Sequence, residues 1–261
     1  MVKAIFFDID GTLVSFRSHK LVSSAKEAIL ELKKKGIKVF IATGRIKKDI
    51  NNLEDLEFDG YITTNGFNVY ADDKEIYKNV ISKEELDAFL DYLANKECFT
   101  CSVMTKNGTF INRYDDNVYE IEKAVNLKFN LANNFSEFVR ENYNEVLQIN
   151  LFVDKEKEDI IMKSIFKNSE ATRWHPRFAD VNTKGGGKHI GVNKILEYYN
   201  IDLSKTMAFG DGGNDITMIK HVNIGIAMGN ANPHLKEVAD YITDDVDEDG
   251  ILKALKHFNL L

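Results

Sequence analysis

The sequence predicts an α/β protein in which a core built on a parallel sheet is interrupted by an inserted α+β domain. In the first and last thirds of the chain, short apolar runs such as Ala4–Phe7 and Lys38–Ala42 alternate with amphipathic helical patterns, as in parallel sheets crossed by helices. Between these thirds, hairpin-like strands are mixed with helices. We therefore expect a discontinuous core, residues 1–82 and 184–261, and an insertion over residues 83–183.

The N-terminal third begins with a buried strand and continues as a strand–helix–strand unit. Ser24 and Glu27 have the spacing of a capping box, so Ser24 is expected to cap a helix that ends at Gly36. The other predicted elements here are strands at 38–42 and 61–63, a turn at Asn65-Gly66 and a hairpin turn at 72–73.

The insertion shows helical and strand periodicities in turn. Ser82 is placed to cap its first helix, and Asn107-Gly108 predicts a hairpin turn. Trp174, the single tryptophan, is expected to pack in the core of this domain. The predicted helices run from Ser82 through Leu93 and over 118–125, 135–141 and 156–166, and the predicted strands cover 99–104, 109–111, 146–153 and 178–181.

Cys98 and Cys101 have a spacing that occurs in redox and zinc sites. In the strand predicted here, residues three apart point to opposite faces, which disfavours a shared metal or a disulfide. No second cysteine pair or closely spaced histidine pair completes a four-ligand zinc site. We expect both thiols to be buried and structural.

The α/β pattern returns at Lys188. Predicted helices cover 188–199, 214–221, 234–238 and 249–258, and predicted strands end at Phe209 and span 224–228.

Composition excludes several classes of protein. A formal net charge of −7 and a pI near 5.5 argue against nucleic acid as a standing partner. No apolar run approaches the ~18 residues of a membrane helix, and the N-terminal apolar stretch is cut by Asp8 and Asp10, so it is not a signal peptide. We expect a cytoplasmic protein with no membrane or evident protein partner.

Asp8 and Asp10 follow the first apolar strand and precede Gly11 and Thr12. Residues two apart leave a strand end on the same side, and ligands of open α/β sheets bind at that edge. Two acids this close repel each other unless a cation or a proton intervenes. The pair therefore suits a metal-assisted carboxylate nucleophile with a second carboxyl group as proton donor, and the alternative is a plain Asp-Gly turn.

Three further polar segments follow strand-like runs or glycines. Thr43-Gly44-Arg45 follows strand 38–42, Lys188 follows three glycines, and an acidic loop at 210–215 follows the run ending at Phe209. Taken singly, Thr43 is explained by a helix cap and Lys188 by a solvated helix start. Arg45 is expected either to reach substrate or to pair with an acid of the core.

Together, DxDGT, a threonine at the second strand end, a lysine and GDGxND resemble the four motifs of the haloacid dehalogenase-like (HAD) phosphatases, in the same order along the chain. The long middle segment resembles the large cap of the Cof-like sugar-phosphatase branch. The resemblance implies a Rossmann-like parallel-sheet core, the HAD fold, that holds the chemistry. It also implies an inserted α+β cap that selects the substrate.

The resemblance also implies residue roles. Asp8 is expected to attack phosphorus and form an aspartyl-phosphate, and Asp10 to act as general acid and base. Mg²⁺ is the expected cofactor, bound by Asp8, Asp10 through its main-chain carbonyl, Asp211 and, through water or Lys188, Asp215. The expected phosphate- or substrate-binding residues are Ile9, Thr43, Gly44, Arg45, Asn65, Lys188 and Asn214.

The sequence thus predicts a Mg²⁺-dependent phosphomonoester hydrolase acting on sugar phosphates or similar small phosphorylated metabolites. A phosphomutase of the same superfamily is the alternative with the same chemistry. Alternatives of another class are a receiver-like signalling domain that is phosphorylated on aspartate and a non-catalytic sugar-phosphate binder.

Overall fold

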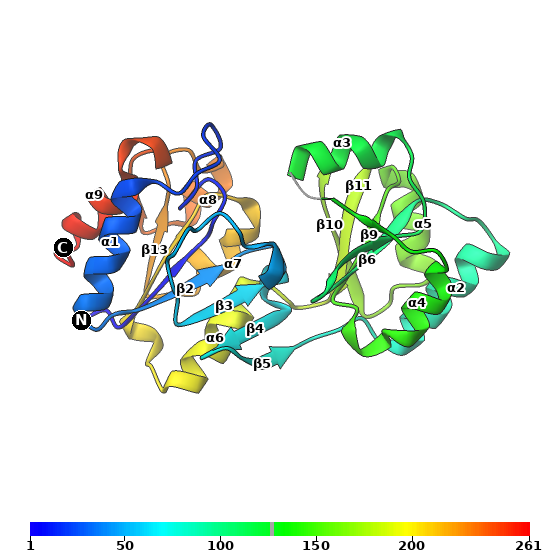
Figure 1. The fold of residues 1–261 in the computed structure, drawn as a ribbon, viewed down its shortest axis with the longest axis horizontal. Coiled ribbons are helices and arrows are strands. Elements are labelled where there is room, and N and C mark those ends of the chain that lie inside the picture. Colours follow the sequence, from blue (N-terminus) through cyan, green and yellow to red (C-terminus); the bar gives the residue numbers. More distant parts are fainter. Residues whose placement is uncertain (126–127) are drawn as a thin grey trace. The chain divides into compact units, whose positions relative to one another are not determined.

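A computed structural model gives the fold of the chain and describes residues 1–125 and 128–261, apart from the side chains of Ala124, Val125 and Trp174. The expected packing of Trp174 thus lies outside the described residues. Two compact units are present: a core unit, Met1–Lys78 with Gly186–Leu261, and an inserted unit, Asn79–Gly185 (Figure 1). No described helix has the length and apolarity needed to cross a membrane.

The core unit is built on one mixed sheet in which the five contacts from β14 to β3 are parallel and the β3–β4–β5 edge is antiparallel. Its strands, in spatial order, are β14 (Tyr241–Ile242), β13 (Ile224–Ala227), β12 (Thr206–Gly210), β1 (Ala4–Phe7), β2 (Lys38–Ala42), β3 (Gly60–Thr63), β4 (Asn68–Ala71) and β5 (Lys74–Lys78).

The central strand β1 is buried along its whole length, as expected for a strand covered on both faces. Phe6 stacks on Phe40 of β2, with ring centroids 5.0 Å apart, and Phe7 stacks on Phe209 of β12 at 5.1 Å. These cross-strand aromatic pairs fix β1 between β2 and β12. The carboxyl ends of these three strands therefore lie side by side.

Helices cover both faces of this sheet (Figure 1). α1 packs with α9, while α6 packs with α7 and α7 with α8. The bounds are α1 (Ser23–Lys34), α6 (Lys188–Tyr199), α7 (Ile216–Ile219), α8 (Pro233–Val238) and α9 (Gly250–His257), with 3-10 turns at Lys47–Asp49, Thr64–Gly66, Leu203–Lys205, Gly213–Asp215 and Val246–Glu248.

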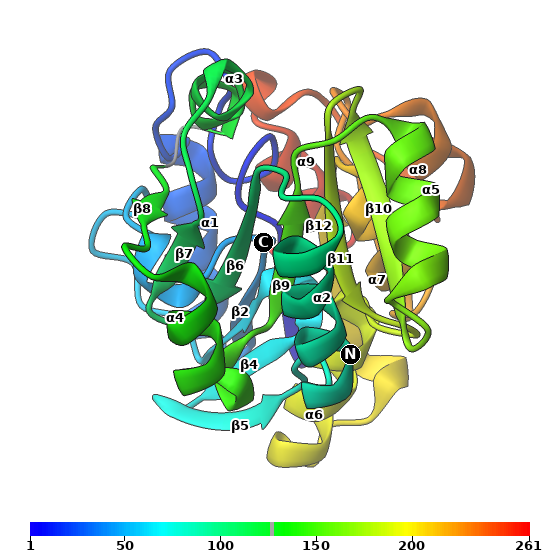
Figure 2. The same cartoon turned by 90° about the vertical axis from the view of Figure 1, so that its right-hand side faces the viewer.

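The inserted unit is built on a second sheet (Figure 2). Its strands, in spatial order, are β10 (Ser169–His175), β11 (Phe178–Thr183), β9 (Gln148–Leu151), β6 (Cys101–Thr105), β7 (Gly108–Ile111) and β8 (Asn130–Leu131). Its helices are α2 (Lys83–Asn95), α3 (Asp116–Val125), α4 (Phe135–Glu141) and α5 (Lys155–Ser164), with a 3-10 turn at Tyr143–Glu145.

The two faces of the second sheet differ in chemistry. One face packs apolar side chains such as Val103 and Ile149 against α2, α4 and α5. On the other, Ile111 and Phe152 pack with α3 in a smaller cluster. Beside this cluster, the same face carries the polar side chains of Ser102, Gln148, Asn150 and Asp180.

Several local predictions are wrong. Helix α1 begins at Ser23 with Val22 as its N-cap and no side-chain cap, while Ser24 donates from its hydroxyl to Asp249, 2.6 Å away. Ser24 therefore lies inside the first turn instead of capping it. Cys98 is exposed and only Cys101 is buried, because β6 begins at Cys101; both thiols are free.

Strand β10 has no counterpart among the predicted elements. Its sequence carries polar side chains on both faces, so it lacks the alternation that marks a half-buried strand. Arg173 in this strand is structural: it pairs with Glu158 at 2.7 Å and donates to the carbonyl of Val153. The two-residue strands β8 and β14 are likewise absent from the sequence prediction.

Candidate active site

The polar segments singled out by the sequence lie at the carboxyl ends of four adjacent strands. Asp8 follows β1, Thr43 follows β2, Thr64 follows β3 and Asp211 follows β12, and these strands are neighbours in the order β12-β1-β2-β3. Lys188 joins them from the first turn of α6. The fold thus gathers residues from both ends of the chain at one edge of the sheet.

A buried ion triad forms the floor of this site. The ammonium of Lys188 lies 2.6 Å from Asp8 Oδ1 and 2.6 Å from Asp215 Oδ1. Lys188 and Asp215 are completely buried, and Asp8 is 7% exposed. Burial alone would lower the pKa of Lys188, but the two carboxylates outweigh it and raise that pKa, so the lysine is charged.

A second acidic group adjoins this triad. Carboxylate oxygens of Asp8, Asp211 and Asp215 lie within 4.8 Å of one another. Burial, aided by Asp215, raises the pKa of Asp211 to about 7, and burial also raises the pKa of Asp8 against the opposing effect of Lys188. A buried cluster whose negative charge exceeds that of its one lysine fits a hard divalent cation with oxygen ligands.

Asp215 also fixes the acidic loop. Its Oδ2 accepts hydrogen bonds from the backbone N–H groups of Asp211, at 3.0 Å, and Gly212, at 2.9 Å. Thr12 donates to Asp211 Oδ1 at 3.2 Å. The side chains that could hold a metal are therefore already oriented by the protein.

Asp10 lies apart from this cluster. Both of its carboxylate oxygens accept from Arg45, Oδ2 from Nε and Oδ1 from Nη2, each at 2.8 Å. Of the two alternatives expected for Arg45, the structure has the pairing with a core acid. The metal role expected for Asp10 concerns its main-chain carbonyl and does not depend on this side-chain pair.

The loop after β1 passes close to the acidic cluster. Gly11 has φ of +86°, and a Cβ there would lie 2.3 Å from Asp211 Oδ2, so a side chain would collide with the acidic cluster. The Ile9 carbonyl accepts from the N–H groups of Leu13 and Val14, whereas in the described part of the chain the N–H groups of Ile9 and Asp10 donate to no backbone acceptor.

The remaining predicted binding residues lie together on the loops after β2, β3 and β12. Thr43 is buried and its hydroxyl accepts from the N–H of Arg45 at 3.2 Å. Asn214 donates from Nδ2 to Asn65 Oδ1 at 2.9 Å, and Gly44 lies against that same oxygen.

Sequence reasoning missed three residues that support the site. Thr12 was seen only as part of a motif, yet it holds Asp211. Asn230 donates to the Gly11 carbonyl at 2.8 Å, and the N–H of Asn232 donates to the Asp211 carbonyl at 2.9 Å. Asn230 and Gly11 are 219 residues apart, so the sequence gives no local signal of that contact.

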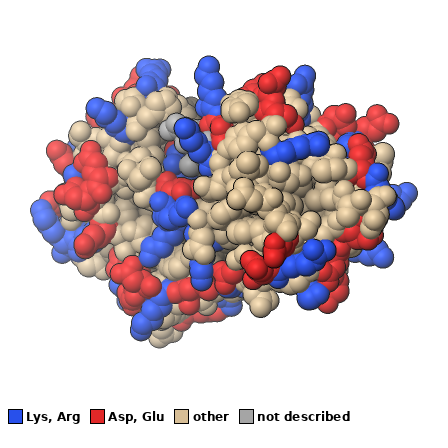
Figure 3. Space-filling model, turned by 45° about the vertical axis from the view of Figure 1, so that its right-hand side comes forward, with Lys and Arg blue, Asp and Glu red and all other residues tan. Residues whose placement is uncertain are grey.

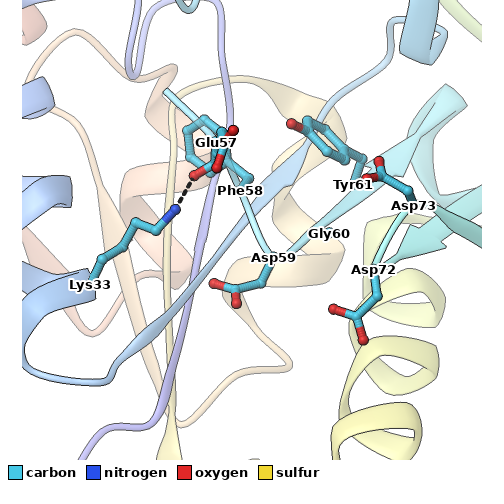
Figure 4. Close-up of a pocket in the computed structure, with 8 residues that line it drawn as sticks. All are labelled: Lys33, Glu57, Phe58, Asp59, Gly60, Tyr61, Asp72 and Asp73. Atoms are coloured by element: carbon cyan, nitrogen blue, oxygen red, sulfur yellow. Dashed lines mark hydrogen bonds between the residues drawn. The ribbon is translucent and has the colours of Figure 1, made fainter. Parts of the chain in front are cut away.

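A cavity of about 240 Å³ lies elsewhere on the core unit, beside the amino end of β3 (Figure 4). Three of its four acids are engaged: Asp59 by Lys38 at 2.8 Å, Asp72 by the hydroxyl of Tyr199 at 2.6 Å and Asp73 by Lys47 at 3.0 Å. This hollow is at the end of β3 opposite the catalytic loops, so it is not the site described above.

Comparison with known families decides the class of the protein. The family model of the haloacid dehalogenase-like hydrolases matches residues 5–255. The chain belongs to the haloacid dehalogenase-like hydrolases. This HAD protein is 36% identical to YkrA of Bacillus subtilis (strain 168) over 262 residues, covering 99% of the chain and 98% of that protein.

Two further relatives have more specific names. The 5-amino-6-(5-phospho-D-ribitylamino)uracil phosphatase YcsE of Bacillus subtilis (strain 168) is 31% identical over 99% of this chain and 96% of its own. Among solved structures, the HAD subclass IIB sugar phosphatase BT4131 is 41% identical with a TM-score of 0.86, covering all of both chains. BT1666 from Bacteroides thetaiotaomicron gives 36% identity and a TM-score of 0.90, covering 100% of this chain and 96% of its own.

These findings confirm the predicted superfamily, the HAD fold and the phosphatase class. On the face of the molecule in Figure 3, acidic and basic side chains are interspersed and form no continuous basic surface.

Proposed function

We propose that this HAD phosphatase is a Mg²⁺-dependent phosphomonoesterase that hydrolyses sugar phosphates or similar small metabolites through an aspartyl-phosphate on Asp8. One observation carries the proposal: Asp8 is buried beside a charged lysine and two further acids, Asp211 and Asp215. Such a carboxylate is positioned and deprived of water before a phosphate arrives, as a nucleophile should be.

The reaction proceeds in two successive displacements at phosphorus. A carboxylate oxygen of Asp8 forms a bond to phosphorus while the bond from phosphorus to the substrate oxygen breaks, and Asp10 gives its proton to that departing oxygen. Asp10 then takes a proton from water, whose oxygen bonds to phosphorus as the Asp8–phosphorus bond breaks. Inorganic phosphate leaves, and both acids return to their starting states.

Asp10 is held in an ion pair with Arg45. Both oxygens of Asp10 are occupied by the guanidinium, so proton transfer by Asp10 requires that pair to open. Arg45 is thus placed to exchange Asp10 for a substrate phosphate or hydroxyl, because a guanidinium binds either kind of oxygen.

Mg²⁺ would be held by Asp8, Asp211 and the Asp10 carbonyl, with Asp215 acting behind them through Lys188 and the loop amides. When bound, it would offset the repulsion between the Asp8 carboxylate and the phosphate dianion. The phosphate oxygens would meet the amides of Ile9 and Asp10, the hydroxyl of Thr43, the amide of Gly44, the Asn214 carboxamide and Lys188.

The inserted unit is proposed to act as the cap that selects the substrate. On the polar face of its sheet, Asn150 and Gln148 both donate to Asp180 Oδ1, at 2.7 and 3.0 Å, and Ser102 donates to Asn150 Oδ1 at 3.0 Å. Asn150, Gln148 and Ser102 are buried, so they fix the orientation of the half-buried Asp180, the member of this network that solvent reaches. A carboxylate held in one orientation accepts from hydroxyl groups, which sugars and polyols carry, and this supports a sugar-phosphate substrate.

The test is phosphate release from a panel of sugar, polyol and nucleotide monophosphates and an aryl phosphate, with Mg²⁺ and with EDTA. We expect turnover of at least one sugar or polyol phosphate, dependent on Mg²⁺ and on Asp8. Preference for nucleotides over every sugar phosphate would refute the substrate class. Transfer of the phosphoryl group back to sugar instead of water would identify a phosphomutase.

A further inference from the structure

The turn after β3 holds three successive residues at positive φ: Thr64 at 48°, Asn65 at 53° and Gly66 at 97°. Glycine adopts this region freely and asparagine tolerates it, but a β-branched threonine does so only under constraint. Thr64 is also completely buried, and its hydroxyl has no hydrogen-bond partner in the described structure. This turn is therefore maintained against the local preferences of its first residue.

Backbone contacts show what maintains it. The N–H of Thr64 donates to the Arg45 carbonyl at 2.9 Å, and the N–H of Asn65 donates to the Thr43 carbonyl at 3.0 Å. A Cβ on Gly66 would lie 2.3 Å from the Gly187 carbonyl, so the turn also packs directly against the residue before Lys188. One strained turn thus touches the loops that carry the predicted phosphate ligands.

The left-handed backbone places the Asn65 carboxamide against Asn214. Asn65 Oδ1 accepts one of the two Nδ2 hydrogens of Asn214, at 2.9 Å, across 149 residues of sequence. A primary amide has two N–H donors in one plane, so occupying the first fixes the direction of the second. Asn214 itself is exposed, on a short 3-10 turn, and gains its orientation from this contact.

We propose that Asn65 is a positioning residue, held by the strained Thr64–Gly66 turn, which aims the second amide hydrogen of Asn214 at a phosphate oxygen. This assignment rests on the proposed phosphatase function and replaces the expected direct contact of Asn65 with substrate. It gives the costly backbone conformation at this strand end a role, because the carboxamide that the turn carries lies beside Gly44 and accepts from Asn214.

The test is a double-mutant cycle with Asn65→Gly and Asn214→Ala. Glycine keeps the left-handed backbone and removes only the carboxamide. With Mg²⁺ present, we expect Asn65→Gly to weaken binding of inorganic phosphate and to raise KM for an aryl phosphate by about 10-fold, the effect of a lost hydrogen bond to a charged group. In the Asn214→Ala background the same change should have an effect of less than about 2-fold, because the residue it acts through is gone.

Asn200→Gly is the matched control. Asn200 also has a left-handed backbone, φ of 50°, but closes α6 at the end remote from Lys188. It should leave phosphate binding and KM unchanged. Equal, additive losses from the two site variants would show that Asn65 contacts the ligand directly and would overturn the positioning role, as would unchanged phosphate binding in Asn65→Gly.

A separate readout distinguishes this proposal from the proposed function. The side-chain amide signals of Asn214 in ¹⁵N spectra of the protein without substrate should shift and exchange faster in Asn65→Gly than in Asn200→Gly. If the wild-type protein released no phosphate from any ester, the proposed phosphatase function would be refuted. The spectra would still test the contact between Asn65 and Asn214, because they require no substrate. Identical Asn214 signals in all three proteins would refute the contact, whatever the activity.

Discussion

Replacing Lys188 by methionine tests the electrostatic account of the site most directly. Methionine keeps much of the buried hydrocarbon but removes the charge that lies 2.6 Å from both Asp8 and Asp215. Removing one partner of a buried ion pair typically costs 3–5 kcal/mol, since the other charge is left unpaired in the interior. Here two carboxylates lose their partner, so we expect a loss of about 4 kcal/mol or more in the free energy of unfolding at pH 8.

The pH dependence of this loss follows from the raised pKa values of the acids. A carboxyl group whose pKa is raised on folding stabilises the protein below its unfolded pKa, about 4, and that stability is lost as the pH rises through the folded pKa. The pKa of Asp211 is raised to about 7. Lys188 lowers the pKa of Asp8, whereas burial and the neighbouring acids raise it, so removing Lys188 leaves the raising effects unopposed. The deficit of Lys188→Met should therefore be largest above pH 7 and shrink towards pH 5.

The assay is urea unfolding of metal-free protein in EDTA, followed by circular dichroism at pH 8 and pH 5.5. Lys194→Met, on the same helix, is the control: Lys194 forms a surface pair with Glu197 and should change stability by less than about 0.5 kcal/mol. A Lys188→Met protein within about 1 kcal/mol of wild type at pH 8, or one whose deficit grows as the pH falls, would refute the reasoning.

Three further predictions concern chemistry, metal and substrate. Asp8→Asn should abolish turnover and covalent phosphorylation together, whereas Asp10→Asn should lose turnover but still bind substrate; substantial activity in Asp8→Asn would exclude the mechanism. Asp211→Ala should weaken Mg²⁺ binding sharply, and in the wild type Mg²⁺ binding should release protons and weaken below about pH 7, as calorimetry in buffers of different ionisation enthalpy would show. Asn150→Ala should alter the ranking of sugar phosphates more than aryl phosphate hydrolysis, and an unchanged ranking would leave the inserted unit without this role.

The sequence was sufficient for features set by local chemistry. Apolar runs followed by polar residues marked β1, β2 and β12 and the loops after them, because a buried parallel strand is apolar along its length. Ser82 caps α2 as expected, accepting from the N–H of Glu85. Gly36, with φ of 74°, ends α1.

Features that depend on distant partners were not predictable. The pairing of Arg45 with Asp10 joins residues 35 positions apart, so the sequence alone did not show which acid of the core Arg45 would meet. Ser24 matched a local capping pattern, but the helix begins two residues earlier than that pattern predicts, and the Ser24 hydroxyl donates to Asp249. The left-handed Thr64 opposes its own local preference, so only the loops packed around it define its conformation.

The central position of β1 has a consequence for synthesis on the ribosome. One edge of β1 pairs with β2, which is translated soon afterwards, but the other pairs with β12, where Ala4 faces Thr206. At typical rates of about 5–20 residues per second, roughly 10–40 s separate the emergence of these two partners. During that interval one edge of a wholly apolar strand is unpaired. The strands of the inserted unit emerge in the same interval, and among the described residues they pair only with one another. The nascent chain is therefore most exposed to aggregation just before its last third appears.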